Sequence, residues 1–383
     1  MPLPQKESAK SAQSVVKKRG EPFGMSRIAR LFRYIEAAKS VLLKPLVAPR
    51  PPIHAQIEVT TFCNLNCKPC LRSKYLLDAP QHLSPENFQR IVAPMRPLKI
   101  SLSGSGEPLM NPDFSEIIRR AKAFGASVNS TSNGTLLTPE RAAELVKSGL
   151  DLLKISIDAA TPDTYRNIRG EECFLRVVDG VRALIEAKKR LGSPTPYIRF
   201  NYVVSRDNYR ELAETAQLAD RLGVDAMYFQ PLLLFGIEER QAELVGDMTQ
   251  DGLTQEIRRA LQLGRSCRVE TNLRMFLRLL PQYWNKYEME KNRQRRLCML
   301  PWFSAYVTLR GDMRPCCTCL YESTTMGNLL ESPLDDVWNS RKYQAFRRAI
   351  RAGKRPFPVC ESCVPQTVED VTRYSKILPG FLR

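Results

Sequence analysis

Three cysteines stand close together early in the chain, at Cys63, Cys67 and Cys70, with the spacing Cys-x3-Cys-x2-Cys. Thiolates are metal ligands, and a structural zinc site closes its shell with four of them, so three leave that shell incomplete. A [4Fe-4S] cluster held by three cysteines instead keeps one iron free to bind another molecule. This stretch therefore predicts an iron-sulfur cluster with an open coordination position.

A second group of cysteines lies near the C-terminal end of the sequence. Cys298 precedes and Cys316 follows a segment that reads as a hairpin, with an apolar run and a Gly-Asp turn. Cys360 and Cys363 form a compact Cys-x2-Cys pair. These four thiols make a closed ligand set. The set suits either zinc or an iron-sulfur cluster, because sequence alone does not separate the two metals.

The chain has 383 residues, 11 cysteines and a formal net charge of +18. This length allows one large domain and a smaller one. We expect a cytoplasmic protein with reduced thiols, because there is no secretory signal pattern and no apolar run that could span a bilayer. The charge favours an acidic partner, such as a phosphate-bearing substrate, an acidic peptide, nucleic acid or an anionic membrane. A solvated basic surface explains the charge equally well.

Short apolar runs alternate with helical patterns through the middle of the chain. Six runs have strand character, at 53–60, 98–104, 127–133, 152–158, 197–204 and 226–234. Five helical patterns lie between them, at 85–95, 113–124, 139–148, 174–190 and 208–222. Such repeats predict an α/β fold in which parallel strands curl into a partial (βα)6 TIM-like barrel. Catalytic side chains are then expected at the C-terminal ends of the strands.

Polar motifs follow the predicted strands at that end. The cysteines come after the first strand, and Gly104-Ser105-Gly106-Glu107-Pro108 comes after the second. Its glycines permit close backbone approach, and Glu107 offers a carboxylate to an ammonium group. The third strand ends in Ser130-Thr131-Ser132-Asn133-Gly134 and the fourth in Ser156-Ile157-Asp158. Taken alone, the glycine-rich turn would be read as an ordinary strand-to-helix connection.

The cysteine spacing and the Gly-Glu-Pro turn together resemble the radical S-adenosylmethionine (radical SAM) enzymes, with Ser105 in place of one glycine. In that family the open iron binds the amino and carboxylate groups of SAM. The resemblance implies that residues 51–235 form the radical SAM core. It also implies a set of SAM-binding residues, which we expect at Gly106, Glu107, Pro108, Ser132, Asn133, Ser156, Arg169 and Gln230.

The resemblance gives several of these residues a role. The turn at 106–108 is expected to contact the SAM amino group, while Ser156 and Arg169 hold the ribose and carboxylate. Gln230, at the end of the sixth strand, would reach the adenine region. The alternative for Arg169 is a surface arginine at a helix end, and the alternative for Gln230 is a residue of the strand core. Many family members have an aromatic residue before the third cysteine, where this chain has Pro69, so adenine stacking is not expected there.

The C-terminal region, 297–383, resembles the auxiliary-cluster domain of these enzymes, in the short Twitch form of the SPASM domain. Segments 326–329 and 337–340 match the region that connects its cysteines. Full SPASM domains carry more cysteines and two auxiliary clusters, whereas nothing comparable follows Cys363 here. We therefore expect one auxiliary [4Fe-4S] cluster besides the SAM-binding one, and a helical linker over 236–296.

The resemblance implies an enzyme that cleaves SAM reductively to a 5′-deoxyadenosyl radical. The radical would abstract hydrogen from a peptide or small metabolite, with the auxiliary cluster relaying an electron. A reductant such as flavodoxin or ferredoxin and an acidic substrate are expected. No residue is assigned to act directly on the substrate, although Cys173, Cys317 and Cys319 are candidate hydrogen donors, and the last two are alternative cluster ligands.

Two other functions remain open at this point. One is radical SAM modification of RNA or a lipid, and the other is a non-catalytic, zinc-stabilised protein that binds nucleic acid. Tyr283, Trp284 and Tyr287 lie among basic residues, which could stack and neutralise nucleic acid. We favour a helix packed by its aromatic residues, because no RNA-binding motif accompanies them.

Residues 1–50 form a basic extension, and we assign no fold to 1–22. Segment 26–43 predicts an amphipathic helix, with an apolar stripe at Ile28, Leu31, Phe32, Ile35, Ala38 and Leu42. We expect the stripe to pack against the body of the protein, as most amphipathic helices do. The alternative is peripheral contact with an anionic membrane, or capture of an acidic leader peptide.

Overall fold

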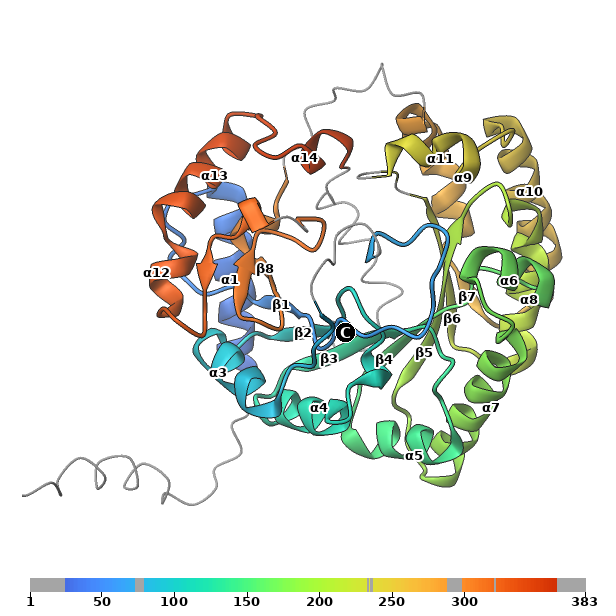
Figure 1. The fold of residues 1–383 in the computed structure, drawn as a ribbon, viewed down its shortest axis with the longest axis horizontal. Coiled ribbons are helices and arrows are strands. Elements are labelled where there is room, and N and C mark those ends of the chain that lie inside the picture. Colours follow the sequence, from blue (N-terminus) through green and yellow to red (C-terminus); the bar gives the residue numbers. More distant parts are fainter. Residues whose placement is uncertain are drawn as a thin grey trace, which may run out of the picture.

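The computed structural model describes residues 25–72, 79–232, 234, 237–287, 298–319 and 322–363. One curved sheet runs through this part of the chain, in the order β10-β9-β8-β1-β2-β3-β4-β5-β6-β7. Helices cover its outer side (Figure 1). The predicted partial barrel of parallel strands is confirmed, and its helices alternate with its strands along the chain.

Six consecutive parallel strands form the centre of the sheet. They are β1 (His54–Ile57), β2 (Lys99–Leu102), β3 (Ser127–Ser132), β4 (Leu152–Ser156), β5 (Tyr197–Val204) and β6 (Ala226–Pro231). Each lies within one of the predicted runs. Several strands are shorter than their runs because the last residues of a run turn away from the ladder to form the strand-end motifs.

The covering helices begin at recognisable caps. Ser84, Thr138 and Thr161 each accept a hydrogen bond at a helix N-terminus and each precedes a proline, which suits the first helical position. The helices are η1 (Pro108–Met110), α3 (Pro85–Met95), α4 (Phe114–Ala123), α5 (Pro139–Ser148), α6 (Pro162–Arg169), α7 (Phe174–Arg190), η2 (Tyr209–Glu211) and α8 (Leu212–Leu222). Helix α6 was not predicted, although its Thr-Pro start carries the same signal.

A helical segment follows β6. It comprises η3 (Glu238–Arg240), α9 (Gln241–Leu244), α10 (Gln250–Leu263), η4 (Gly264–Ser266), the short strand β7 (Glu270–Thr271) and α11 (Leu273–Tyr287). Trp284 is buried on α11, as expected of a packed helix, while the side chains of Tyr283 and Tyr287 lie outside the described residues. Strand β7 extends the sheet in parallel beside β6.

The C-terminal cysteine-rich region adds strands to the other edge of the same sheet. Its elements are η5 (Leu300–Trp302), β8 (Ser304–Val307), β9 (Asp312–Arg314), η6 (Glu322–Thr324), β10 (Gly327–Asn328), α12 (Leu334–Trp338), α13 (Arg341–Arg351) and α14 (Val359–Ser362). Strand β8 pairs in parallel with β1, and β9 returns antiparallel to β8 as the predicted hairpin.

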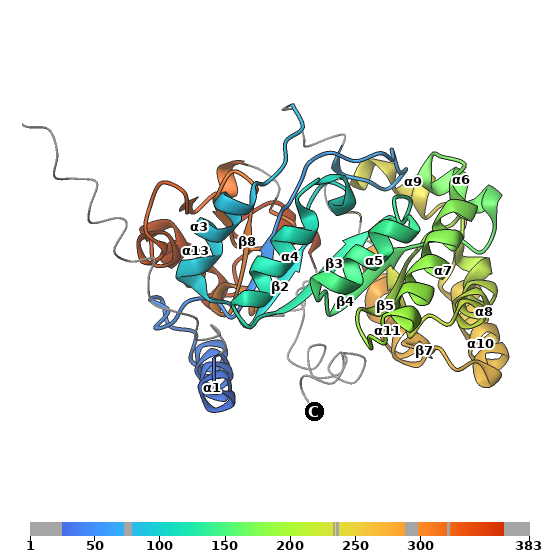
Figure 2. The ribbon, with the colours of Figure 1, turned by 90° about the horizontal axis from the view of Figure 1, so that it is seen from below.

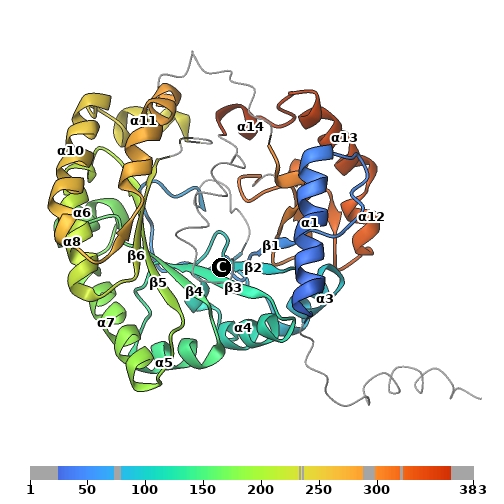
Figure 3. The same ribbon diagram turned by 180° about the vertical axis from the view of Figure 1, so that it is seen from behind.

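Helix α1 (Arg27–Leu43) forms where the sequence predicts it, but its orientation differs from our expectation. Ile28, Leu31, Phe32 and Leu42 of the apolar stripe are 82%, 61%, 51% and 75% exposed. The opposite, arginine-bearing face lies on the protein instead. The expected packing of the stripe is therefore wrong. Figures 2 and 3 show α1 at the outside of the molecule, over the C-terminal region.

Within the described residues, none of the helices combines the length and apolar character that crossing a bilayer requires.

Candidate active site

The cysteine loop lies at the C-terminal end of β1 and is tied to the ends of neighbouring elements. The Asn64 side chain donates to the Thr135 hydroxyl (2.8 Å) and accepts from the side-chain amide of Asn133 (2.9 Å), and both partners follow β3. The Lys68 amide donates to the Ile168 carbonyl of α6 (2.8 Å). These bonds hold the loop over the strand ends, where parallel barrels place their active sites.

The three thiols of the loop lie near one another, because a thiolate charge on Cys67 raises the pKa of Cys63 and one on Cys70 raises the pKa of Cys67. Burial raises the pKa of Cys63 and of Cys67. Across the described residues, no three Cys, His, Asp or Glu side chains gather tightly enough to ligate a single metal ion. The donor set, three soft thiols in a pinned loop, suits a multi-iron cluster.

The Gly-Glu-Pro turn packs directly against the cysteine loop. The Gly106 amide donates to the Thr60 carbonyl (3.1 Å), and the Glu107 amide donates to the Phe62 carbonyl (2.7 Å). A Cβ atom on Gly106 would stand 2.4 Å from the Phe62 carbonyl oxygen, which is far inside contact distance. Glycine is required here because two backbones meet, and the meeting sets the height of the loop above the sheet.

Glu107 is buried and its carboxylate is fully engaged. It accepts hydrogen bonds from the Ser132 hydroxyl (2.7 Å) and from the amides of Asn133 (2.6 Å) and Leu109 (3.1 Å). Burial raises the pKa of Glu107, and these donors act in the opposite direction. The residue thus joins the ends of β2 and β3, a structural role that the sequence did not indicate. Its contact with the SAM amino group stays a prediction.

Arg169 ends α6 and points back toward the cysteines. Its guanidinium forms an ion pair with Asp158 and donates to the Cys67 sulfur (3.6 Å). Burial disfavours its charge, but Asp158, Cys67 and Tyr165 together outweigh burial, and the pKa of Arg169 is raised. Its Nε is buried without a hydrogen-bond partner, which leaves a donor for an anionic or polar ligand beside the loop.

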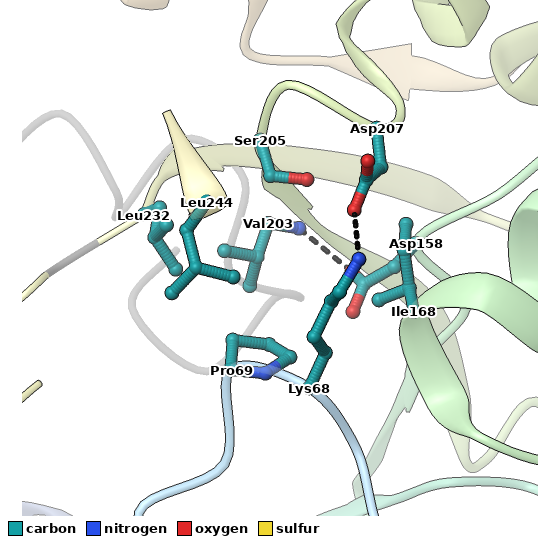
Figure 4. A pocket seen from close by; sticks show the side chains of 9 residues that line it. All are labelled: Lys68, Pro69, Asp158, Ile168, Val203, Ser205, Asp207, Leu232 and Leu244. Carbon is teal, nitrogen blue, oxygen red and sulfur yellow. Dashed lines mark hydrogen bonds and ion pairs between the residues drawn. The ribbon is translucent and has the colours of Figure 1, made fainter. Parts of the chain in front are cut away.

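A small cavity adjoins this ion pair at the ends of β4, β5 and β6 (Figure 4). Pro69, Leu232 and Leu244 form its apolar side, while Asp158 and the Lys68–Asp207 ion pair (3.0 Å) form its polar side. It lies where the sixth strand was expected to approach the adenine. Pro69 thus supplies a wall without an aromatic face.

Two further predicted residues lie on the concave inner face of the sheet. Ser156 ends β4, opposite Asn201 of β5, and Gln230 is paired with Val203 near the end of β6. Both are half-buried. Ser132 and Asn133 lie at the end of β3, the neighbour of β4, so the structure brings the predicted SAM-binding residues to one end of the sheet. The contacts of each with SAM stay predictions.

The inner face carries cations on the side of Ser156 that is toward the N-terminal ends of the strands. Lys154 of β4 and Arg199 of β5 are register partners, so two positive side chains stand side by side. Burial lowers the pKa of Lys154 far below its usual value, and Arg199 and Lys99 of β2 lower it further. In the described part of the chain, no carboxylate forms an ion pair with Lys99 or Lys154. Lys154 donates instead to the Asn129 amide oxygen (2.6 Å).

The four C-terminal cysteines come together around the β8–β9 hairpin. Burial first, and then the charges of Cys316, Cys363 and Cys360, raise the pKa of Cys298 to about 12, which places these thiols near one another. Cys319 is fully buried and its sulfur lies 3.5 Å from that of Cys316. Sequence reasoning left Cys319 as an alternative ligand, and its position keeps that alternative open.

Cys317 differs from its neighbours because it is exposed. Its thiol is near enough to the Lys154 ammonium that a thiolate charge there opposes, in small part, the burial and the cations that lower the pKa of that lysine. The auxiliary cysteines and the cationic part of the inner face therefore meet at this residue.

Comparison with known proteins identifies the family of the chain. Residues 57–219 match the radical SAM superfamily model, and residues 298–364 match an iron-sulfur cluster-binding domain, SPASM. The chain is a radical SAM enzyme with a SPASM-type domain. The two matches cover the strand-end site and the C-terminal cysteine set.

Several relatives of this radical SAM enzyme span most of its length. It is 26% identical to a tungsten-containing aldehyde ferredoxin oxidoreductase cofactor-modifying protein of Pyrococcus furiosus, over 80% of this chain and 86% of that protein. It is 28% identical to a PqqA peptide cyclase of Streptomyces rochei, over 77% and 78%. The fold resembles Streptococcus suis SuiB bound to precursor peptide SuiA, with a TM-score of 0.63, 14% identity and coverage of 95% and 83%.

Membership assigns [4Fe-4S] clusters and SAM as cofactors. The residues present fit these groups. Cys63, Cys67 and Cys70 supply three thiols in a fixed loop, and the unpartnered Nε of Arg169 supplies a donor next to them.

Two carboxylates of the site were missed from the sequence as site residues. Asp158 looked like the end of a strand, yet it is buried and orients Arg169. Glu58 follows β1 and accepts from the Ser105 amide and the Tyr306 hydroxyl, both at 3.1 Å. It therefore links the Gly-Glu-Pro turn to β8. A carboxylate directly after an apolar strand was the available signal in both cases.

Proposed function

We propose that this radical SAM enzyme modifies a peptide, and that the modified side chain enters the inner face of the sheet next to an acidic group. The observation that carries the proposal is a group of inner-face cations: Lys154 is the register partner of Arg199, and Lys99 lies two strands away on β2. Within the described residues, no carboxylate forms an ion pair with Lys99 or Lys154. Half-buried cations gathered on one face of a sheet are stabilised by an anion. The relationship to a PqqA peptide cyclase supports a peptide as the carrier.

When bound, SAM and the clusters supply a 5′-deoxyadenosyl radical and a one-electron acceptor. The protein residues provide the arrangement. We assign Cys63, Cys67 and Cys70 to the first cluster, and Arg169, oriented by Asp158, to the polar groups of SAM. The acidic group of the substrate pairs with Lys154, which fixes the reacting carbon relative to the strand ends.

The C-terminal cysteines are assigned to an auxiliary cluster that accepts the electron of a net oxidation. Cys298, Cys316, Cys360 and Cys363 are the proposed ligands, since the last three all lie near enough to Cys298 to act on its pKa. Cys317, exposed beside Lys154, is the side chain of this region best placed to meet the substrate.

Anaerobic reconstitution tests the assignment of the first cluster. Replacement of Cys63, Cys67 and Cys70 by Ala is expected to abolish formation of 5′-deoxyadenosine after reduction, while the iron and sulfide of the auxiliary cluster remain. Replacement of Cys267, a cysteine of the helical segment, serves as the control and leaves both unchanged. Zinc in place of iron, with no SAM cleavage by the unmodified chain, would overturn the proposed function.

Matched peptide pools test the substrate class. Two synthetic pools of equal length, one containing Asp and Glu and the other Asn and Gln at the same positions, are incubated with enzyme, SAM and reductant. Mass changes are expected in the acidic pool. Lys154→Met should lower them at least tenfold while uncoupled 5′-deoxyadenosine formation continues, and Lys154→Arg should restore part of them. Equal modification of both pools would contradict an acidic substrate.

A further inference from the structure

The exposed stripe of α1 is an unusual surface feature. Ile28, Leu31, Phe32, Ile35 and Leu42, here called the α1 apolar face, are 82%, 61%, 51%, 43% and 75% exposed. Single exposed apolar residues are common, whereas a contiguous set along one helix marks an interaction surface. The face lies outside the site described above and has no part in the SAM chemistry.

The orientation of this face is fixed by the other side of the helix. Arg30 donates to the Gly125 carbonyl (2.5 Å), and Arg33 donates to the carbonyls of Arg96 and Pro52. Ala37 and Ser40 are buried on the same side. Because the polar side of the helix is bound to the protein, the apolar side faces outward. The stripe is thus exposed on a helix that is attached to the body.

The charges around the face are positive. Glu36 is the one acidic residue of α1, and it forms an ion pair with Lys39 (3.0 Å). Arg27, Lys39, Arg50 and Arg96 are exposed cations on or beside the helix. Burial, and then the charge of Arg50, lowers the pKa of Arg33, and the Arg96 backbone carbonyl accepts a hydrogen bond from Arg33. Arg50 and Arg96 therefore both lie beside the helix.

We propose that α1 binds the surface of an anionic membrane, with its apolar face in the boundary between headgroups and acyl chains. A helix that is apolar on one side and flanked by cations matches the interfacial mode of binding, in which burial of apolar area and attraction to anionic lipids add together. The formal net charge of +18 provides a long-range attraction of the same sign. The face is a single convex helix at the outside of the molecule (Figure 2), which suits insertion into a fluid surface.

Vesicle sedimentation tests the proposal with the reconstituted full chain. Binding is expected to vesicles of phosphatidylcholine and phosphatidylglycerol, to weaken at high salt, and to be slight with phosphatidylcholine alone. Leu31→Glu combined with Ile35→Glu should reduce binding at least tenfold, because it removes two buried apolar side chains and adds negative charge. Leu175→Glu is the matched control, since Leu175 is a 66% exposed leucine on α7, away from the face, and should bind as the unmodified chain does.

Circular dichroism and 5′-deoxyadenosine formation establish that each variant is folded, because the substituted residues are exposed and touch no part of the site. Equal binding of the Leu31/Ile35 variant and the unmodified chain would overturn the proposal. So would a dimer of the unmodified chain that this variant converts to a monomer, since the face would then bind a second copy. Neither outcome bears on peptide modification.

Discussion

At the scale of single residues, the site depends on charges that the fold buries in pairs. Glu107 is 2% exposed and is balanced by three donors, and Asp158 is 3% exposed and is balanced by Arg169. Arg169 could be predicted because the family resemblance extends to it. The partners could not, because a buried carboxylate is recognisable only once the donors around it are placed. Gly106 was predictable only in part. The sequence showed the turn, but it could not show that glycine is required there because the backbone of Phe62 lies so close.

Removal of Arg169 should be costly, since it leaves the Asp158 carboxylate buried without its cation. Arg169→Ala is expected to lower the free energy of unfolding by about 3 kcal/mol and to weaken SAM binding at least tenfold. Chemical denaturation and equilibrium dialysis with SAM measure the two effects. Arg166→Ala, on the same helix, is the control, because its partners Asp163 and Glu172 are exposed and the loss should stay below about 1 kcal/mol. Equal effects of both changes would refute the role of Arg169.

A methyl group at Gly106 should displace the cysteine loop. Because the added Cβ would meet the backbone oxygen of Phe62 at 2.4 Å, relief requires movement of a main chain. Gly106→Ala is expected to reduce 5′-deoxyadenosine formation at least a hundredfold at saturating SAM, with the auxiliary iron retained. Gly264→Ala has no atom within 4 Å of its Cβ and should leave the rate unchanged. Normal SAM cleavage by Gly106→Ala would show that the turn does not set the loop.

At the scale of elements, the six strands were predictable because each is an apolar run bounded by turn residues, and because repetition of βα units leaves one topology. Helix α6 was not predicted, since it is short and mostly polar; its Thr161-Pro162 start and the buried Tyr165 and Ile168 are its few signals. Helix α1 was predicted with the wrong face inward. Its apolar period is real, but arginine hydrogen bonds to Gly125 and Arg96 decide its orientation. Period alone identifies the two faces of a helix without deciding which one is covered.

Contacts between strands should make stability depend on pH through His54. This residue joins three strands, since its ring nitrogens bond the hydroxyls of Ser304 (2.8 Å) on β8 and Ser101 (3.0 Å) on β2. Burial, then Lys99 and Lys154, lowers the pKa of His54 from 6.5 to about 3. His54 therefore binds a proton below about pH 6.5 in the unfolded chain, but only below about pH 3 in the folded chain. Stability falls as the pH falls through this window.

Between pH 7.5 and pH 5.5 this group should cost the folded state about 1.4 kcal/mol. His54→Gln removes the titrating group, so the variant, although less stable at pH 7.5, should lose about 1.4 kcal/mol less over the same interval. Urea denaturation of both proteins at the two pH values measures the difference. Parallel losses in the two proteins would contradict a buried, neutral His54.

At the scale of the whole molecule, the radical SAM core and the SPASM-type region share one sheet. Strand β8 pairs with β1, and Trp302 and Trp338 donate to the carbonyls of Pro45 (2.8 Å) and Arg50 (3.0 Å), which precede β1. The sequence indicated two cysteine sets and the order of their segments. It could not indicate this pairing, because β8 lies some 250 residues after β1 and hydrogen-bonding partners at that separation leave no local pattern.

The shared sheet separates two roles of the C-terminal region, as a scaffold and as a ligand set. A chain that ends at Tyr287 leaves the backbone groups of β1 unpaired along one edge and uncovers the surface beneath Trp302 and Trp338, so it should be insoluble or should fail to cleave SAM. The full chain with Cys360→Ser and Cys363→Ser keeps every strand. It should fold, retain the first cluster and cleave SAM, while product formation that needs the auxiliary cluster is lost. Iron content, circular dichroism and 5′-deoxyadenosine measure these outcomes. A soluble truncated chain that cleaves SAM would mean that β1 does not require β8, and the core would then be an independent unit.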